Sequence, residues 1–218
     1  MMIFPSLTSQ NPHDIEQKVH LLEPFCHGFH VDIADGNFVP TTLGSIELVH
    51  FIRSHTNKPL WIHLMVEDPL AYVQRLNLHP GDTVTFHNEA VKDTNPIIET
   101  LEHKRLEPGI AINPETALTS MASFCTLVGQ ITIMTVKPGA SGQPFITDMY
   151  KKIEMLNALR ASQECSFSIA VDGGITLDIA KKLIYYGVNK VAVGSAIMSS
   201  SDPVEALKKF IQLSDFDE

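Results

Sequence analysis

Short runs of apolar and β-branched residues recur along the whole chain, and they predict eight β-strands. Between consecutive runs, apolar residues return at helical spacing, which is typical of helices with one buried face. Ile153, Leu156 and Leu159 are one such set. The predicted strands are Ile3–Leu7, Phe29–Ile33, Leu60–Val66, Thr83–His87, Gly109–Asn113, Gln130–Val136, Ser168–Asp172 and Lys190–Gly194.

The alternation of strands and helices continues through the chain without a linker or low-complexity segment, so residues 1–218 are expected to form one domain. Asp68-Pro69 and Asp202-Pro203 mark helix starts, since an N-cap oxygen precedes a proline. An open doubly wound sheet is the alternative, but no G-x-G-x-x-G fingerprint follows a strand. We therefore predict an α/β protein, a single (β/α)8 TIM barrel.

Composition and charge disfavour several classes of partner and compartment. With 218 residues, 44% of them hydrophobic and 19% charged, the chain suits a globular domain with a large core. The net charge of −9 argues against nucleic acids and membrane surfaces as partners. The three cysteines form no C-x-x-C pair, so neither a disulfide framework nor a thiolate zinc site is expected. No export signal or membrane-spanning run is evident, and the expected location is the cytoplasm.

The first candidate site consists of polar residues on predicted strands, because barrel active sites form at the carboxyl ends of the strands. His30 and Asp32 lie two residues apart, so both side chains point into the barrel. His63 lies at the same height on the next strand. Two imidazoles and a carboxylate are typical ligands of a divalent metal. The alternative is a pair of hydrogen-bonded core histidines.

Asp172 ends the seventh predicted strand and should approach the barrel mouth from the side opposite Asp32. Two carboxylates on opposite faces of a carbon suit a reaction that removes a proton from one face and returns one to the other. A metal would stabilise the negative oxygen of the intermediate. The pattern predicts inversion of a carbon next to a carbonyl, and the alternative for Asp172 is an Asp-Gly turn.

Glycines gather in the loops after the sixth, seventh and eighth predicted strands: Gly139 and Gly142, Gly173-Gly174, and Gly194-Ser195. Backbone N–H groups in such loops bind phosphate without positive side chains, which suits a chain of negative net charge. Tight turns are the alternative. A further polar set, His87-Asn88-Glu89, is expected to surround the site rather than to form a second metal centre.

These segments resemble the ribulose-phosphate 3-epimerase family over essentially the whole chain. The resemblance implies a TIM barrel of the ribulose-phosphate-binding type that interconverts ribulose 5-phosphate and xylulose 5-phosphate. It also implies a place in the pentose phosphate pathway, a homo-oligomer, and one divalent metal ion per subunit, with zinc favoured over iron(II), manganese or cobalt. The matching segments are Pro5-Ser6-Leu7, His30 through Pro40, His63-Leu64-Met65, Asn113-Pro114, Pro138 through Gln143, Val171 through Gly174 and Gly194 through Ile197.

The resemblance also implies roles for individual residues. Asp32 and Asp172 would be the catalytic acid/base pair, and His30, Asp32, His63 and Asp172 would bind the metal. The substrate would contact Ser6, His63, Gly139, Ala140, Ser141, Gly142, Gly173, Gly174, Gly194 and Ser195.

Departures from the family pattern leave alternatives open. Ala34 stands where the family usually has Met, and Lys137, Ala140 and Ser141 change a loop that usually carries an aromatic residue and a further glycine. The smaller side chains suggest looser sugar choice, and the stretches Met134-Thr135-Val136 and Gly142-Gln143-Pro144-Phe145 resemble the allulose 6-phosphate epimerase branch. The departures also leave open a sugar-phosphate-binding barrel without catalysis. Lys137 also leaves open lysine-based chemistry, as in a decarboxylase, or a thiamine-phosphate synthase-like transferase.

Overall fold

The structure is a computed structural model that describes residues 1–7 and 11–213. The interpretation of residues 1–218 as one domain also takes in residues 8–10 and 214–218, which lie outside the described part, and it stays a prediction. The strands are β1 Met2–Pro5, β2 Phe29–Asp35, β3 Thr42–Leu43, β4 Leu60–Met65, β5 Thr83–His87, β6 Glu107–Ile112, β7 Gln130–Met134, β8 Ser168–Asp172 and β9 Lys190–Val193.

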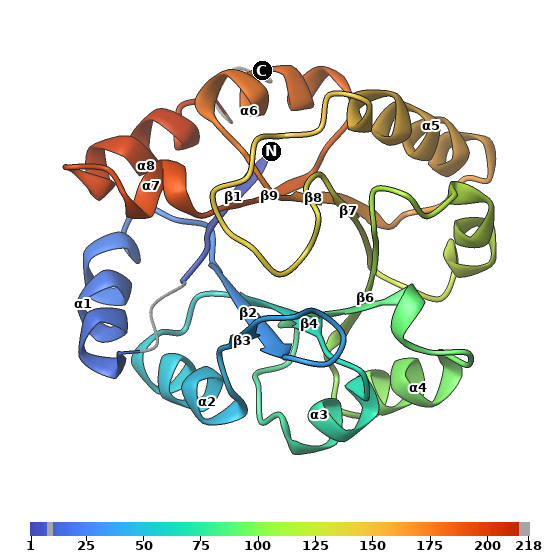
Figure 1. Ribbon diagram of the computed structural model, residues 1–218, viewed down its shortest axis with the longest axis horizontal. Helices are drawn as coiled ribbons and strands as arrows, with labels where there is room; N and C mark the ends of the chain where they lie inside the picture. The colour runs from blue at the N-terminus through green and yellow to red at the C-terminus, as the bar shows by residue number, and fades with distance from the viewer. Residues whose placement is uncertain (8–10, 214–218) are drawn as a thin grey trace.

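Helices connect most of the strands and lie outside them (Figure 1). Two short 3-10 helices also occur, η1 at Asn88–Ala90 and η2 at Leu118–Phe124, and η2 stands in the connection between β6 and β7. The α-helices are α1 Pro12–Leu22, α2 Ile46–His55, α3 Pro69–Arg75, α4 Asn95–His103, α5 Met149–Ser162, α6 Leu177–Tyr185, α7 Ser195–Met198 and α8 Pro203–Ile211.

The strands curl into a ring, in the order β1-β9-β8-β7-β6-β5-β4-β2-β3 (Figure 1). All neighbouring pairs are parallel except β2 with β3. Between β1 and β2, a parallel bridge joins Ser6 to His30, and the Leu7 N–H donates to the His30 carbonyl at 2.9 Å. The predicted (β/α)8 barrel is confirmed.

One strand was missing from the sequence prediction. β3 is only two residues long and turns back antiparallel on the end of β2, pairing Leu43 with Ala34 and Thr42 with Asp35. Two residues are too few to show the alternation by which strands are recognised. The consequence is functional, because β3 brings Leu43 to the carboxyl end of the barrel, where it lines the cavity described below.

The helix starts predicted at Asp68-Pro69 and Asp202-Pro203 are confirmed by N-cap hydrogen bonds. The Asp68 carboxylate accepts from the Ala71 N–H at 3.2 Å at the start of α3, and Asp202 accepts from the Glu205 N–H at 3.0 Å at the start of α8. Each cap satisfies a backbone donor that the first helical turn leaves unpaired, and the proline that follows has no such donor. No helix among the described residues is long and apolar enough to cross a membrane.

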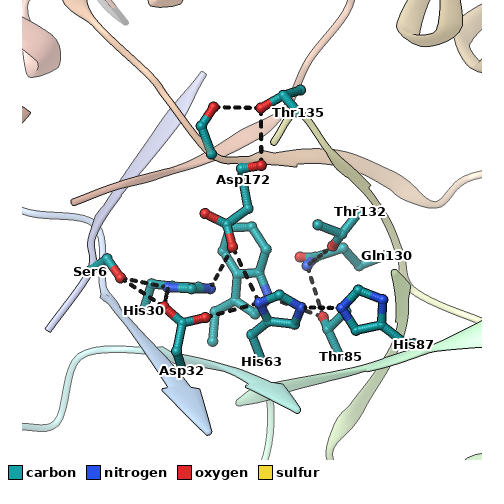
Figure 2. Close-up of polar contacts among 12 residues, drawn as sticks. Ser6, His30, Asp32, His63, Thr85, His87, Gln130, Thr132, Thr135 and Asp172 are labelled. Carbon is teal, nitrogen blue, oxygen red and sulfur yellow. Dashed lines mark hydrogen bonds and ion pairs between the residues drawn. The ribbon is translucent and has the colours of Figure 1, made fainter. Parts of the chain in front are cut away.

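Two layers of buried side chains hold the barrel together. The larger lies between strands and helices, where β-branched and leucine side chains from both are almost fully buried. Inside the ring, the buried side chains of Phe4 and Trp61 meet edge to face, with ring centroids 5.9 Å apart. The Trp61 indole N–H donates to the Thr85 hydroxyl at 3.0 Å, and the Gln130 amide donates to the same oxygen at 3.2 Å (Figure 2). This interior closes the barrel beneath its carboxyl end.

Candidate metal centre and active site

Four predicted residues converge at the carboxyl end of the barrel: His30 and Asp32 on β2, His63 on β4 and Asp172 at the end of β8. Each offers one nitrogen or oxygen, and the four atoms lie within 4.8 Å of one another. The register explains the convergence, because Asp32 pairs directly with His63 across β2 and β4. We refer to these residues as the four-residue cluster.

Within this cluster, the two carboxylates approach the imidazoles from different walls of the barrel (Figure 2). Nδ1 of His63 lies 2.9 Å from Oδ1 of Asp32 and 3.2 Å from Oδ2 of Asp172. Nε2 of His30 lies 3.6 Å from the same Asp172 oxygen. Figure 2 shows Asp172 entering the site from the end of β8 and Asp32 from β2, with both carboxylates near Nδ1 of His63. That the two acids face opposite sides of a substrate stays a prediction.

The donor set fits a divalent metal ion. Nδ1 of His30 is hydrogen-bonded to the Ser6 hydroxyl at 2.9 Å, whereas Nε2 is buried and has no hydrogen-bond partner among the described residues. Nε2 of His63 contacts His87 at 2.9 Å, which leaves Nδ1 facing the two carboxylates. Each imidazole thus has one nitrogen held by the protein and the other directed at the acids, as in histidine metal ligands. Two imidazoles and two carboxylates match the charge and ligand preference of such an ion.

The charges in this cluster perturb one another strongly. Burial would raise the pKa of Asp32, but the charge of His30 and the hydrogen bond from His63 lower it below its usual value. Burial would likewise lower the pKa of His63, yet hydrogen bonds to Asp172 and Asp32 raise it to about 9. A cation bound between the acids and Nδ1 of His63 would compete with a proton for that nitrogen.

A cavity of about 240 Å³ opens beside this cluster. Asp32 and Asp172 reach it directly, and the side chains of Ala34, Met65 and Met134 form part of its apolar wall. The predicted substrate residues that line it are Ser6, Gly139, Ala140, Ser141, Gly142, Gly173, Gly174, Gly194 and Ser195. His63 was also expected to contact substrate, but it is fully buried and is not among the lining residues.

Comparison with known protein sequences shows which family this chain belongs to. Residues 2–198 match the model of the ribulose-phosphate 3 epimerase family. The chain belongs to the ribulose-phosphate 3-epimerase family. The Methanocaldococcus jannaschii ribulose-phosphate 3-epimerase is 36% identical over 83% of this chain and 76% of its own. The Treponema pallidum enzyme of the same name is 30% identical over 90% of this chain and 91% of its own.

Solved structures share the fold at much lower identity. The 3-hexulose-6-phosphate synthase of Salmonella typhimurium has a TM-score of 0.74 and 16% identity, with both chains covered completely. KGPDC from Streptococcus mutans, solved in complex with D-R5P, has a TM-score of 0.74 and 14% identity over 99% of this chain and 97% of its own. These likenesses show the TIM-barrel fold alone.

In this member of the ribulose-phosphate 3-epimerase family, glycines let the loop after β7 close over the barrel mouth (Figure 1, residues 137–148). A Cβ on Gly174, whose φ is +65°, would lie 2.5 Å from the Phe145 nitrogen. Gly139 packs against Val39, and its carbonyl accepts from the Thr41 hydroxyl at 2.6 Å. These glycines therefore serve tight loop packing, and phosphate binding by their backbone N–H groups stays a prediction.

Thr135 was missed by sequence reasoning, although it supports the end of β8. Its hydroxyl lies 3.0 Å from the Asp172 carbonyl and 2.5 Å from the Gly173 carbonyl, and its N–H donates to the Asp172 carbonyl at 2.8 Å (Figure 2). These bonds hold the backbone that carries the Asp172 carboxylate. A threonine just after an apolar strand gives no such signal in the sequence, because its partner lies 37 residues away.

Lys137, which left lysine-based chemistry open, is exposed and does not line the cavity. Ala34 does line it, with a buried side chain that packs in a small apolar cluster with Val39 and Met65. These two departures thus differ in position: Ala34 is part of the cavity wall, whereas Lys137 is not.

Proposed function

We propose that the protein is a metal-dependent ribulose-phosphate 3-epimerase that interconverts D-ribulose 5-phosphate and D-xylulose 5-phosphate. The observation that carries the proposal is the pair of carboxylates, Asp32 and Asp172, that reach one cavity from two different strands, β2 and β8. Epimerisation beside a carbonyl needs a proton acceptor on one face of the carbon and a proton donor on the other. The names of the relatives support the same reaction.

In this proposal, one aspartate removes the proton from C3 and the other delivers a proton to the opposite face. The roles exchange between the two reaction directions, so each carboxyl group must be ionised in one direction and protonated in the other. The apolar side chains of Met65 and Met134 keep water away from the reacting carbons. His30, Asp32, His63 and Asp172 would hold the divalent ion, which when bound supplies electrostatic stabilisation of the enediolate charge.

The proposed metal is zinc, because two imidazoles and two carboxylates suit it, although iron(II), manganese and cobalt(II) accept the same ligands. Metal analysis of freshly purified protein distinguishes them.

We propose that the phosphate lies against the backbone N–H groups of Gly139–Gly142, Gly173, Gly174, Gly194 and Ser195. Backbone groups there would offset the repulsion expected from a net charge of −9. A cytoplasmic homo-oligomer completes the proposal, and light scattering with size exclusion tests the assembly.

Hydrogen exchange at C3 tests the mechanism. In D₂O with ribulose 5-phosphate and added metal, xylulose 5-phosphate formed in the first turnover should carry deuterium at C3, because the delivering aspartate has exchanged with solvent. Substrate recovered early should carry much less. Product that keeps the original hydrogen would indicate one base acting from one face. Binding without turnover or exchange would instead favour a non-catalytic sugar-phosphate-binding barrel.

The allulose 6-phosphate alternative is not favoured by the names of the relatives, but Ala34 and Ala140 on the cavity wall make it testable. Smaller side chains at these positions should admit a larger sugar. We expect kcat/KM to favour ribulose 5-phosphate over allulose 6-phosphate by less than about 10⁴-fold. A larger ratio would contradict the argument from site volume.

A further inference from the structure

His87 at the end of β5 lies directly behind His63. Both side chains are fully buried, and their rings are nearly parallel, with centroids 5.0 Å apart. Their Nε2 atoms are 2.9 Å apart, so one ring must donate a hydrogen and the other must accept it (Figure 2). The direction of this bond determines where each ring carries its remaining hydrogen.

The proposed metal site requires one direction. Nδ1 of His63 faces Asp32 and Asp172, and a nitrogen that ligates a metal carries no hydrogen. A neutral His63 then keeps its hydrogen on Nε2 and donates it to Nε2 of His87. A neutral His87 that accepts at Nε2 carries its own hydrogen on Nδ1.

Glu89 stands where that second hydrogen needs an acceptor. Its Oε2 lies 3.4 Å from Nδ1 of His87, which is buried and makes no hydrogen bond to the described residues. Its other oxygen, Oε1, accepts from the Asn113 N–H at 2.8 Å and from the Thr116 hydroxyl. Burial would raise the pKa of Glu89, but the close approach of His87 and the hydrogen bonds from Thr116 and Asn113 lower it to about 2, so the carboxylate is charged.

We propose that His87 and Glu89 are positioning residues that hold His63 in the tautomer that ligates the metal. Glu89 favours the hydrogen of His87 on Nδ1, which makes Nε2 of His87 the acceptor and leaves Nδ1 of His63 free for the ion. The opposite arrangement would place the Nδ1 lone pair of His87 against the Glu89 carboxylate, which is repulsive. Such supporting partners also raise the basicity of the ligand. The inference rests on the proposed function only through its metal site.

The first test is the affinity of the full-length protein for zinc, measured by competition with a chromophoric chelator. Glu89→Gln keeps the shape of the side chain but removes its charge, and we expect zinc affinity to fall about 10- to 100-fold. Glu115→Gln is the matched control, because it removes an exposed carboxylate from the neighbouring loop, and less than a twofold change is expected. Unchanged affinity in Glu89→Gln would overturn the inference.

The second test needs no variant and stays decisive if Glu89→Gln fails to fold. In zinc-loaded protein labelled with ¹⁵N-histidine, long-range NMR correlations should find the hydrogen of His63 on Nε2 and that of His87 on Nδ1. A hydrogen on Nε2 of His87 would overturn the inference. Wild-type protein that binds zinc but does not epimerise ribulose 5-phosphate would refute the proposed function alone. Wild-type protein that binds no divalent ion would overturn both.

Discussion

The barrel buries charged side chains at both ends, and the two sets are built differently. At the carboxyl end, the four-residue cluster brings two carboxylates together with two imidazoles, and Nε2 of His30 has no hydrogen-bond partner in the described part of the chain. At the amino end, Arg53 of α2 meets Asp82, which precedes β5, with Nη1 at 3.0 Å from both carboxylate oxygens. The first set contains an excess of negative charge, whereas the second is balanced.

Backbone groups also form hydrogen bonds with both side chains of the Arg53–Asp82 pair. Asp82 accepts from the Leu60 N–H at 2.8 Å and from the His79 N–H at 2.9 Å, and Arg53 Nη2 donates to the carbonyls of residues 56 and 58. Among the described residues, only Nε of Arg53 is left without a partner in this pair. A buried charge is tolerated when it is paired and hydrogen-bonded. The balanced pair therefore serves the fold, whereas the excess negative charge of the cluster fits the binding of a cation.

The largest effect is expected at the carboxyl end. Asp172→Asn keeps the shape of the side chain but removes its ability to carry a proton, so kcat should fall by about 10²- to 10⁴-fold. The thermal midpoint of the metal-free protein should not fall, because the change removes an excess negative charge. Steady-state epimerase assays and thermal melts check both expectations. A variant with more than about a tenth of wild-type kcat would exclude the acid/base role.

The opposite result is expected at the amino end. Arg53→Met leaves Asp82 charged, buried and unpaired, and it should destabilise the protein by about 3–5 kcal/mol while kcat at saturating metal stays within about twofold of wild type. Denaturant unfolding and the epimerase assay measure the two quantities. The double variant Arg53→Met/Asp82→Asn is the control and should recover part of the lost stability, because no unpaired charge remains and the amide oxygen can still accept from a backbone N–H. Stability that is unchanged in the single variant would contradict the comparison.

The sequence revealed the unbalanced cluster but not the balanced pair, for a physical reason. Strand alternation puts His30 and Asp32 on one face, and neighbouring parallel strands place His63 beside them. Arg53 instead lies in a helix and Asp82 in a connection, 29 residues apart, so no local period relates them. An arginine near the end of an amphipathic helix is usually solvated, and here it is only 7% exposed.

His63 shows a similar limit. Its place in the cluster was predictable from strand order, but the contact with His87 depends on ring orientation across β4 and β5. The sequence therefore indicated polar surroundings at His87 without indicating which ligand they support. β3 was missed because two residues carry no periodic signal.

Zinc binding should also distinguish the two ends of the barrel, through a change in stability that is smaller than the loss expected for Arg53→Met. At a free zinc concentration of 100 times Kd, the wild-type protein should gain about 2.7 kcal/mol of stability, since the folded state alone presents the assembled ligands. Arg53→Met should gain the same amount from its lower starting point. His63→Ala should gain much less at that concentration, and excess zinc or manganese should restore part of its activity. Full metal content in dialysed His63→Ala would show that His63 is not a ligand.

The smallest effect is expected from a second ion pair at the amino end. This pair tests whether the contribution of an ion pair to stability depends on how deeply its side chains are buried. Nζ of Lys190 lies 2.9 Å from Oε2 of Glu107, but these side chains are 11% and 30% exposed, against 6% and 3% for Arg53 and Asp82. Water can therefore partly solvate Glu107 when its partner is lost, and the Thr83 hydroxyl continues to donate to it.

Lys190→Met keeps the apolar stem of the side chain, so its loss of stability should be about 1 kcal/mol, between the values for exposed and fully buried pairs. For a chain of this size, that corresponds to about 2–4 °C in the thermal midpoint. Glu107→Gln is the control and should show a similar loss, because it removes the same attraction from the other side. A loss above about 3 kcal/mol would mean that exposure does not set the difference between the two pairs, and that the amino end depends on both equally.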